Sequence, residues 1–465
     1  MSDAPDYIST RGEAPGASFA DVLLAGLAPD GGLYLPEAWP RLSAAETADL
    51  RGNTDYIAVA TEILFRFAGG SFRRDEIHAD VTAAYAEFDD PAIVPLKTLA
   101  PGLHLLELFH GPTLAFKDLA LQVLGRLFAR ALQRRGGRAT VVVATSGDTG
   151  SAAIAALGGL PNIDVFVLHP LGRVSEVQRR QMTTASHANI HNIALEGTFD
   201  DAQSLVKALF ADTDFANAIS LTAVNSINFA RIAAQAVYYF TASRIGGASV
   251  FVVPTGNFGD VFAGEAAMRM GLPIEKLVIA TNANDILARA LNDGVYARGA
   301  VHASLSPSMD IQVASNFERA LFEASNRDSA WLREAMAAFA RDGQLAIRPD
   351  VLAALRTRYT AFACDDALTL ETMARARRDF GEILDPHTAV ALAAALPWWE
   401  AKQHDVVVLS TAHPAKFPDA VAKATGARPP VPARLKGLLD RPESFEILPN
   451  VKALVRAHIE SKLGL

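Results

Sequence analysis

Three times along the chain, a short run of β-branched and apolar residues ends in a turn of small polar residues. The runs are Ala139 to Ala144 (ATVVVA), Ser249 to Val253 (SVFVV) and Asp405 to Leu409 (DVVVL). After the first two turns the sequence continues with helical periodicity, over residues 151 to 157 and 260 to 270. Buried strands that alternate with helices are typical of βαβ units. The sequence therefore predicts an α/β fold with open, twisted, mostly parallel sheets flanked by helices.

The three turns are the first candidates for a binding site. They cover residues 146 to 150 (SGDTG), 254 to 259 (PTGNFG) and 410 to 414 (STAHP). In open α/β sheets, ligands bind outside the carboxyl ends of the parallel strands, which is where these turns lie. The glycines at 256 and 259 also precede a helix, whose free N–H groups and positive dipole end favour a phosphate. The motif is neither a P-loop nor a dinucleotide fingerprint, so a plain strand-to-helix turn is an equal alternative.

The rest of the chain divides into regions of different pattern. Residues 1 to 95 carry a turn signal at 30 to 32 and amphipathic stretches at 55 to 67 and 75 to 88, which predict a small, mainly helical N-terminal unit. Residues 96 to 465 are predicted to form the catalytic region of two α/β subdomains, with a mainly helical elaboration at about 285 to 385. A helix after residue 118 is expected to take Asp118 as its N-cap, since aspartate is a preferred capping residue.

Charge and composition exclude several classes of protein. The net charge of −8 comes from 51 acidic and 43 basic residues without a basic stripe, so we expect no nucleic-acid partner. The apolar stretch Ala389 to Leu396 is far shorter than the roughly 20 residues that cross a bilayer, so no membrane association is expected. Acidic residues near the N-terminus argue against a signal peptide, which predicts a cytoplasmic protein. The single cysteine, Cys364, leaves no partner for an internal disulfide.

One lysine has the surroundings of a reactive amine. Lys117 lies in the segment LFHGPTLAFKD, residues 108 to 118, among apolar residues and next to the start of a helix. Burial and the positive end of the helix both lower the pKa of an amine, and Schiff-base formation needs the neutral amine. A lysine in such a position is by itself more often a surface residue. The combination of this amine with a phosphate turn and a polar strand end in one sheet favours the catalytic interpretation.

Four motifs in order resemble those of threonine synthase, a pyridoxal-phosphate enzyme of fold type II. They are FKD at 116 to 118, SGDTG at 146 to 150, GNFG at 256 to 259 and STAHPAKF at 410 to 417. Further segments of the resemblance lie at 9 to 12, 26 to 34, 172 to 175, 225 to 228 and 306 to 310. The resemblance extends over nearly the whole chain. It implies the two-sheet fold of that class and pyridoxal 5'-phosphate as the cofactor.

The resemblance also implies which residues hold the cofactor. Lys117 would form the Schiff base and, once the substrate displaces it, move protons among the Cα, Cβ and Cγ atoms. The hydroxyl of Thr411 would meet the pyridine nitrogen, and a neutral partner leaves that nitrogen largely unprotonated. The backbone amides that would bind the cofactor phosphate belong to Gly256, Asn257, Phe258 and Gly259.

The turn at 146 to 150 resembles the loop that binds the substrate carboxylate, through Ser146, Asp148 and Thr149. Asp148 departs from the pattern of the broader class, whose members often have an amide at this position. An ionised aspartate would repel a carboxylate. Either its carboxyl group points away from the substrate, or the backbone N–H groups of the turn bind the carboxylate.

A second group of substrate residues is implied near the start of a helix. Arg231 offers the planar fork that fits a substrate phosphate, while an arginine in a surface ion pair is the alternative. The group consists of Asn225, Ser226, Asn228 and Arg231.

Four histidines receive no catalytic role. His187 and His191 have the i, i+4 spacing of a metal pair but no third ligand, so we expect solvent-facing side chains and no metal site. His387 and His413 are expected to shape the site.

The implied reaction converts O-phospho-L-homoserine and water into L-threonine and phosphate. Two alternatives use the same lysine and phosphate-binding turn: a phospho-lyase and a hydroxy-amino-acid dehydratase. A third is a catalytically silent paralogue that binds a phosphorylated ligand. Both a monomer and a homodimer agree with the sequence.

Overall fold

The larger of two main sheets carries most of the predicted turns. The computed structural model describes residues 7 to 222, 226 to 247 and 249 to 465. Its six-stranded sheet is parallel except for β3, and its strands, in spatial order, are β13 (Tyr359–Ala363), β10 (Ile274–Thr281), β9 (Ser249–Pro254), β14 (Val406–Ser410), β4 (Leu103–Glu107) and β3 (Leu96–Ala100). The predicted strands at 249 to 253 and 405 to 409 are found as β9 and β14, each within one residue.

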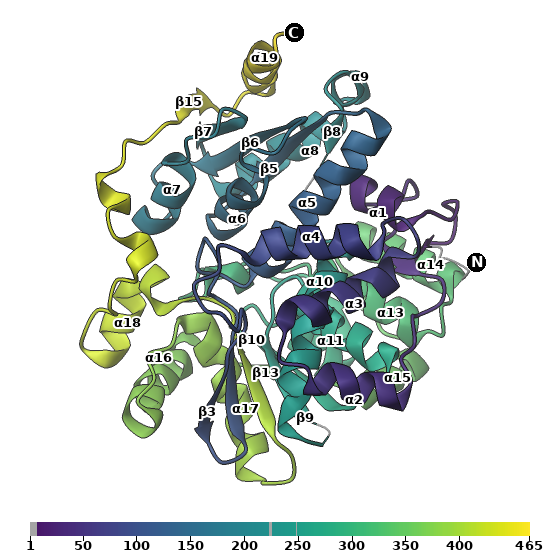
Figure 1. The fold of residues 1–465 in the computed structure, drawn as a ribbon, viewed down its shortest axis with the longest axis vertical. Helices are drawn as coiled ribbons and strands as arrows, with labels where there is room; N and C mark the ends of the chain where they lie inside the picture. Colours follow the sequence, from purple (N-terminus) through teal and green to yellow (C-terminus); the bar gives the residue numbers. More distant parts are fainter. Residues whose placement is uncertain (1–6, 223–225, 248) are drawn as a thin grey trace.

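The second sheet is parallel throughout. Its five strands, in spatial order, are β15 (Glu446–Pro449), β7 (Ile190–Glu196), β6 (Ile163–Pro170), β5 (Ala139–Ala144) and β8 (Leu221–Thr222). This sheet lies in the upper part of the molecule in Figure 1, and the six-stranded sheet lies in the lower part. The predicted fold of two open, mostly parallel α/β sheets is therefore confirmed.

Helices cover both sheets and separate them. Those nearest the site are α5 (Lys117–Arg135), α6 (Asp148–Leu157), α10 (Phe229–Ala242), α11 (Gly259–Met270) and α17 (Pro386–Glu400). The outer helices of the second sheet are α7 (Glu176–Thr183), α8 (Phe199–Phe210), α9 (Thr213–Ala218) and α19 (Lys452–Leu463). Every residue of α10 is buried, as expected of a helix that is apolar around most of its circumference. Residues on α10 therefore have fixed surroundings.

The N-terminal unit is mainly helical, as predicted. It contains β1 (Tyr7–Ser9), α1 (Phe19–Ala25), β2 (Tyr34–Pro36), α2 (Ala44–Gly52), α3 (Tyr56–Ala68) and α4 (Arg74–Tyr85). Its aromatic side chains pack on α10, where the rings of Tyr7 and Phe67 lie 5.2 and 5.5 Å from that of Phe229. The unit thus shares one hydrophobic core with the catalytic region.

The region at 285 to 385 is mostly helical but supplies one strand to the main sheet. It contains α12 (Ile286–Asp293), β11 (Val295–Ala297), α13 (Phe317–Ala324), α14 (Ser329–Asp342), β12 (Gln344–Ala346), α15 (Pro349–Arg358) and α16 (Asp366–Arg375). The strand β13 was not predicted, because it is short, lies at the sheet edge and is only partly buried.

The described part of the chain has no helix long and apolar enough to cross a membrane.

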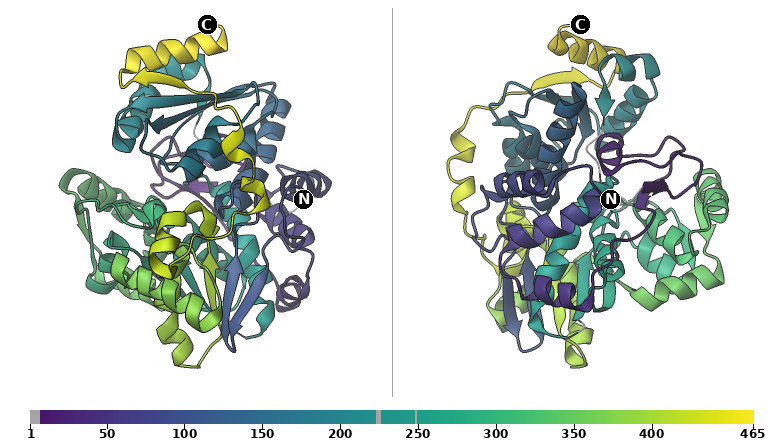
Figure 2. Two further views of the ribbon diagram at one scale, coloured as in Figure 1. Left: turned by 90° about the vertical axis from the view of Figure 1, so that its left-hand side faces the viewer. Right: turned by 45° about the vertical axis from the view of Figure 1, so that its right-hand side comes forward.

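The C-terminal segment connects the two halves of the molecule. After α18 (Pro418–Thr425) it runs along the outside to β15 and α19, as both views of Figure 2 show. There β15 pairs with β7 and forms the edge of the second sheet. The chain thus leaves the main sheet after β14 and ends on the other sheet.

Two helices begin earlier than predicted. The helix α5 begins at Lys117 with Phe116 in the N-cap position, so the expectation that Asp118 caps it was wrong. The Asp118 carboxylate instead accepts hydrogen bonds from the N–H and the Oγ1 of Thr113, both at 2.7 Å. It therefore holds the loop before Lys117. The helix α6 begins at Asp148 rather than at residue 151, which makes part of the SGDTG turn its first turn.

Candidate active site

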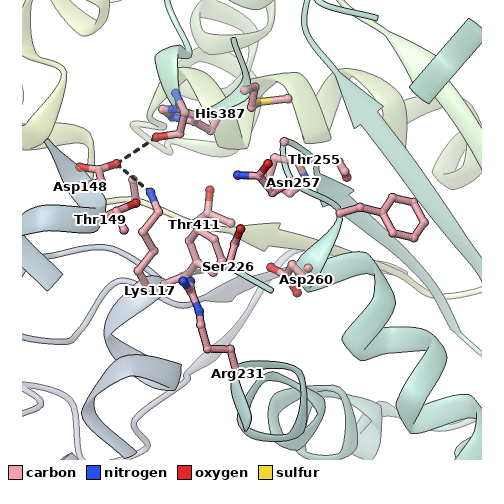
Figure 3. Close-up of a pocket in the computed structure, with 18 of the residues that line it drawn as sticks. Lys117, Asp148, Thr149, Ser226, Arg231, Thr255, Asn257, Asp260, His387 and Thr411 are labelled. Atoms are coloured by element: carbon pink, nitrogen blue, oxygen red, sulfur yellow. Dashed lines mark hydrogen bonds and ion pairs between the residues drawn. The ribbon is translucent and has the colours of Figure 1, made fainter. Parts of the chain in front are cut away.

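A cavity of about 280 Å³ lies between the two sheets, at the carboxyl ends of their strands. Its walls come from the segments that follow β4, β5, β9 and β14, together with α10 (Figure 3). The three predicted turns meet here, two from the main sheet and one from the second sheet. A ligand in this cavity would contact segments that are far apart in the sequence.

The side chain of Lys117 reaches into this cavity from the first turn of α5. Its Nζ lies 3.5 Å from Oδ2 of Asp148, and its side chain is 12% exposed. Burial lowers the pKa of the Lys117 amine, Asp148 opposes this shift, and the positive charges of Lys416 and Arg231 add to it. The amine is thus more easily neutral than that of an ordinary lysine, as Schiff-base formation requires.

The glycine turn forms an anion site at the start of α11. Within the described residues, no hydrogen bond occupies the backbone N–H groups of Gly256, Asn257, Phe258 or Gly259. Phe258 stands in the left-handed region, with φ of 65°, and its ring is buried against those of Phe317 and Tyr359. Non-glycine residues rarely adopt this conformation unless packing imposes it, so the buried ring anchors the turn.

Thr411 contributes a hydroxyl group to the same cavity. Its carbonyl oxygen accepts a hydrogen bond of 2.8 Å from the N–H of Phe116, which fixes the strand end against the lysine loop. Figure 3 shows its side chain pointing into the cavity. Among the described residues nothing hydrogen-bonds to its Oγ1, which leaves the hydroxyl available to a ligand.

These three features fit pyridoxal phosphate. A reactive amine suits the aldehyde of the cofactor, and open amides at a helix N-terminus suit its phosphate. A neutral hydroxyl group suits the ring nitrogen. The structure brings the residues predicted to hold the cofactor, Lys117, the turn at 256 to 259 and Thr411, together in one cavity.

The predicted substrate residues divide into two sets. Asp148, Thr149, Ser226 and Arg231 line the cavity, whereas Ser146 is exposed outside it. Asn228 is also outside the lining, because its Oδ1 caps α10 at Ala230 N–H and its Nδ2 donates to the Leu23 carbonyl oxygen. Its polar atoms are thus occupied by structural contacts. Asn225 lies outside the described residues.

The orientation of Asp148 follows from its partners. Its Oδ1 lies 2.7 Å from Nζ of Lys416 and accepts a 2.9 Å hydrogen bond from Gln178. Its Oδ2 accepts from Lys117 and, at 3.1 Å, from Ser308. Burial alone raises the pKa of the Asp148 carboxyl, but the two ammonium groups together hold it well below its usual range. The carboxylate is ionised and fully engaged, while no described residue occupies the N–H groups of Asp148 and Thr149.

Arg231 is buried without a counter-ion in the part of the chain that the structure describes. The exposed fraction of Arg231 is 5%, and no carboxylate of the described residues forms an ion pair with its guanidinium group. Burial lowers the pKa of its guanidinium group to about 10, so the group remains charged at neutral pH. An uncompensated buried charge is costly, which indicates that an anionic ligand completes this part of the cavity. The burial of Arg231 excludes the alternative that it is a surface residue in an ion pair.

Several polar residues in the cavity lining or directly behind it were not predicted as substrate or cofactor ligands, among them Ser308, His387 and Asp260 in the lining. Ser308 lies in the segment 306 to 310, and Lys416 lies in STAHPAKF, so both were inside motifs of the resemblance. His387 lines the cavity, accepts the Ser308 N–H at Nε2 and faces Asp385 with Nδ1 at 2.8 Å. Gln178 and Asp260 had no sequence signal; Asp260 lines the cavity, whereas Gln178 lies behind it against Asp148.

The remaining histidines lie away from the cavity lining. His413 caps a short 3-10 helix, η4 (Pro414–Lys416), through Nδ1. His187 is exposed as predicted, but His191 lies on β7 and stacks on Phe166 at 4.5 Å, so it is not solvent-facing. The two therefore do not share a helical face.

The fold and the site together define the class of protein. The molecule has two mostly parallel sheets, with a lysine, a glycine turn and a threonine where the sheets meet. This arrangement is characteristic of pyridoxal-phosphate enzymes of fold type II. The family described as "Pyridoxal-phosphate dependent enzyme" matches residues 92 to 411. The families described as "Threonine synthase N terminus" and "Threonine synthase, C-terminal" match residues 6 to 85 and 388 to 459.

Individual relatives define the family within this class. The chain is 49% identical over 458 residues to the threonine synthase of Pseudomonas aeruginosa, with 97% of each chain covered. It superposes on the pyridoxal-phosphate-bound threonine synthase of Brucella melitensis with a TM-score of 0.95, 48% identity and 99% of each chain covered. For the yeast threonine synthase the TM-score is 0.95, with 36% identity and full coverage of both chains. The chain belongs to the threonine synthase family, and its cofactor is pyridoxal phosphate.

The two glycines of the turn differ in the space around them, which gives a first prediction. A Cβ atom on Gly256 would lie 2.7 Å from the carbonyl oxygen of Ser308, whereas one on Gly259 would lie no closer than 3.4 Å to Asn316. We expect Gly256→Ala to weaken cofactor binding roughly 5- to 150-fold, because overpacking costs about 1 to 3 kcal/mol. Gly259→Ala serves as the matched control and should weaken cofactor binding much less. Absorbance titration with pyridoxal phosphate measures both, and equal effects would contradict the steric argument.

Proposed function

We propose that the chain converts O-phospho-L-homoserine and water into L-threonine and phosphate. The observation that carries this proposal is the buried guanidinium group of Arg231, which has no described counter-ion and lines the same cavity as Lys117. A phosphorylated substrate would supply the missing negative charge. The amino acids that a dehydratase acts on lack this charge.

The cofactor supplies an electron sink that stabilises negative charge on the carbon atoms of a bound amino acid. We assign the proton transfers to Nζ of Lys117. It removes the proton from Cα, which the bound cofactor would hold in the meantime, and the amine, neutral again, then removes one from Cβ as phosphate leaves Cγ. The Cβ proton is delivered to Cγ, and the Cα proton is finally returned. Water supplies the hydroxyl group of Cβ and gives its other proton to the phosphate. The lowered pKa of Lys117 supports this role, because a neutral amine accepts protons.

We assign the substrate carboxylate to the first turn of α6. The open N–H groups of Asp148 and Thr149 and the Thr149 hydroxyl group are available for it. The positive end of the α6 dipole favours an anion at this place. The Asp148 side chain does not oppose this assignment, because its charge is neutralised by Lys416 at 2.7 Å.

We assign the substrate phosphate to Arg231, with Ser226 beside it. Arg231 projects from the buried helix α10, and both side chains can be followed in Figure 3. A guanidinium fork binds phosphate oxygens in pairs, which fixes orientation as well as charge. Ser146 and Asn228 are left out of the proposed binding set, because neither lines the cavity.

The proposal is tested by incubating the purified holoenzyme with O-phospho-L-homoserine and measuring phosphate, threonine and 2-oxo acid. We expect phosphate and threonine in equal amounts. Phosphate with 2-oxo acid and no threonine would indicate a phospho-lyase instead. Absence of every product, with the cofactor bound, would indicate the silent paralogue. The cytoplasmic location and the choice between monomer and homodimer remain proposals from the sequence.

The proposed contact of Thr411 with the ring nitrogen gives a second prediction. Thr411→Val removes the hydroxyl group and nearly preserves the volume, so the protein should still fold and bind the cofactor, with modestly lower affinity. We expect kcat to fall roughly tenfold, because one lost hydrogen bond is worth about 1 to 1.5 kcal/mol. The visible absorbance band should shift as well. An unchanged rate together with an unchanged spectrum would show that Thr411 does not face the ring.

A further inference from the structure

A second lysine lies directly behind the catalytic one. The side chain of Lys416 is 0% exposed, and its Nζ lies 2.7 Å from Oδ1 of Asp148. The other oxygen of the same carboxylate faces Nζ of Lys117 at 3.5 Å. The carboxylate of Asp148 therefore lies between two ammonium groups, one in the cavity and one buried beneath it.

Lys416 also joins three segments of the chain that form the site. It belongs to η4, which follows Thr411, and its partner Asp148 begins α6 of the second sheet. Its Nζ donates a second hydrogen bond, of 2.9 Å, to the carbonyl oxygen of Thr113. Thr113 is in turn held by Asp118, the neighbour of Lys117. One ammonium group thus connects the cofactor-ring segment, the substrate-carboxylate turn and the lysine loop.

We propose that Lys416 is a positioning residue that acts through Asp148: it turns the Asp148 carboxylate away from the bound substrate and balances its charge beside Lys117. This inference rests on the proposed function for the substrate carboxylate, but its effect on Lys117 does not depend on the substrate. Without Lys416, the Asp148 carboxylate would face Lys117 uncompensated and hold it as an ammonium ion. A protonated Lys117 can neither bind the cofactor covalently nor accept a proton.

The charge balance around Lys117 has few other contributors. Arg231 on α10 lowers the pKa of Lys117, as Lys416 does, whereas Asp148 raises it. His387 on α17 is turned toward Asp385, and burial raises the pKa of the Asp118 and Asp260 carboxyls to about 6. The titratable and charged groups around the cavity are Asp118, Asp148, Arg231, Asp260, His387 and Lys416, and of these Asp148, Arg231 and Lys416 act on the pKa of Lys117.

The test compares four full-length variants, each freed of cofactor and mixed with pyridoxal phosphate. The visible absorbance band gives the rate of covalent uptake at each pH, which depends on the neutral fraction of Lys117. For Lys416→Met we expect the half-maximal pH to rise by about one unit, with roughly tenfold slower uptake at neutral pH. Asp148→Asn should lower the half-maximal pH. The double variant Lys416→Met/Asp148→Asn lacks both charges, so its half-maximal pH should be close to that of the parent protein.

The control is Lys423→Met, the same change at an exposed lysine of α18, which should leave the uptake profile unaltered. A Lys416→Met profile equal to that of the parent protein overturns the proposal. The proposal is also overturned if the half-maximal pH of the double variant is raised as much as that of Lys416→Met, since Lys416 would then not act through Asp148. If Lys416→Met fails to fold, recovery of folding and of the parent profile in the double variant supports the proposal, and failure to recover overturns it. Uptake involves no substrate, so the result is independent of whether O-phospho-L-homoserine is consumed.

Discussion

Lys117→Ala is expected to lower turnover by about 10⁴-fold or more and to remove the visible absorbance band of covalently held cofactor. The reason is that Lys117 is the sole lysine among the described residues that line the cavity, so no second amine can form the linkage or move the protons. Pyridoxal phosphate should still bind noncovalently, because the glycine turn and Thr411 are unchanged. Measurements of threonine formation and of the absorbance spectrum check both statements.

Two controls make this result specific. Lys423→Ala changes an exposed lysine outside the cavity and should leave rate and spectrum as they are. The melting temperature of the Lys117→Ala variant should stay close to that of the parent protein without cofactor, because Lys117 contributes few structural contacts. Turnover within tenfold of the parent value would show that another residue moves the protons, and the assignment of Lys117 would be wrong.

Arg231→Leu is expected to lower kcat/KM for O-phospho-L-homoserine roughly 10- to 100-fold while the cofactor stays bound. Loss of a hydrogen bond to a charged group typically costs about 1.5 to 3 kcal/mol. The same variant should be more stable without substrate, with a melting temperature higher by roughly 2 °C, because a buried charge without a described partner is replaced by an apolar side chain. A gain in stability with a loss of activity is the mark of a binding residue.

Arg319 provides the matched comparison, because it is also a buried arginine. Its guanidinium group donates to the carbonyl oxygens of Tyr34 and Ile227 and to the side chain of Asn316. Among the described residues, Arg231 has no such structural partners. Arg319→Leu should therefore lower the melting temperature, the opposite of Arg231→Leu. If Arg231→Leu is destabilised in the same way, Arg231 has a structural role. Loss of cofactor rather than of substrate affinity would assign it to the cofactor phosphate.

The sequence by itself determined the parts of the structure that depend on local patterns. The strand β5 has the bounds that its β-branched run predicts, and β9 and β14 differ by one residue, because fully buried strands read as continuous apolar runs. The edge strands β13 and β15 were missed, since a short, partly exposed strand carries no such run. The motifs also led to Lys117, the glycine turn and Thr411, which lie in one cavity.

Only the tertiary structure decided how charged side chains of the site are paired. Asp148 could have met the substrate with its carboxylate, but Lys416, distant in sequence, turns and neutralises it. Arg231 could have been a surface residue, but burial of α10 isolates its charge. Asn228 was predicted as a substrate ligand, and folding places both of its polar atoms in structural hydrogen bonds. Strand and helix patterns are local properties of the chain, whereas the partner of a buried charge is set by folding, which brings distant segments together.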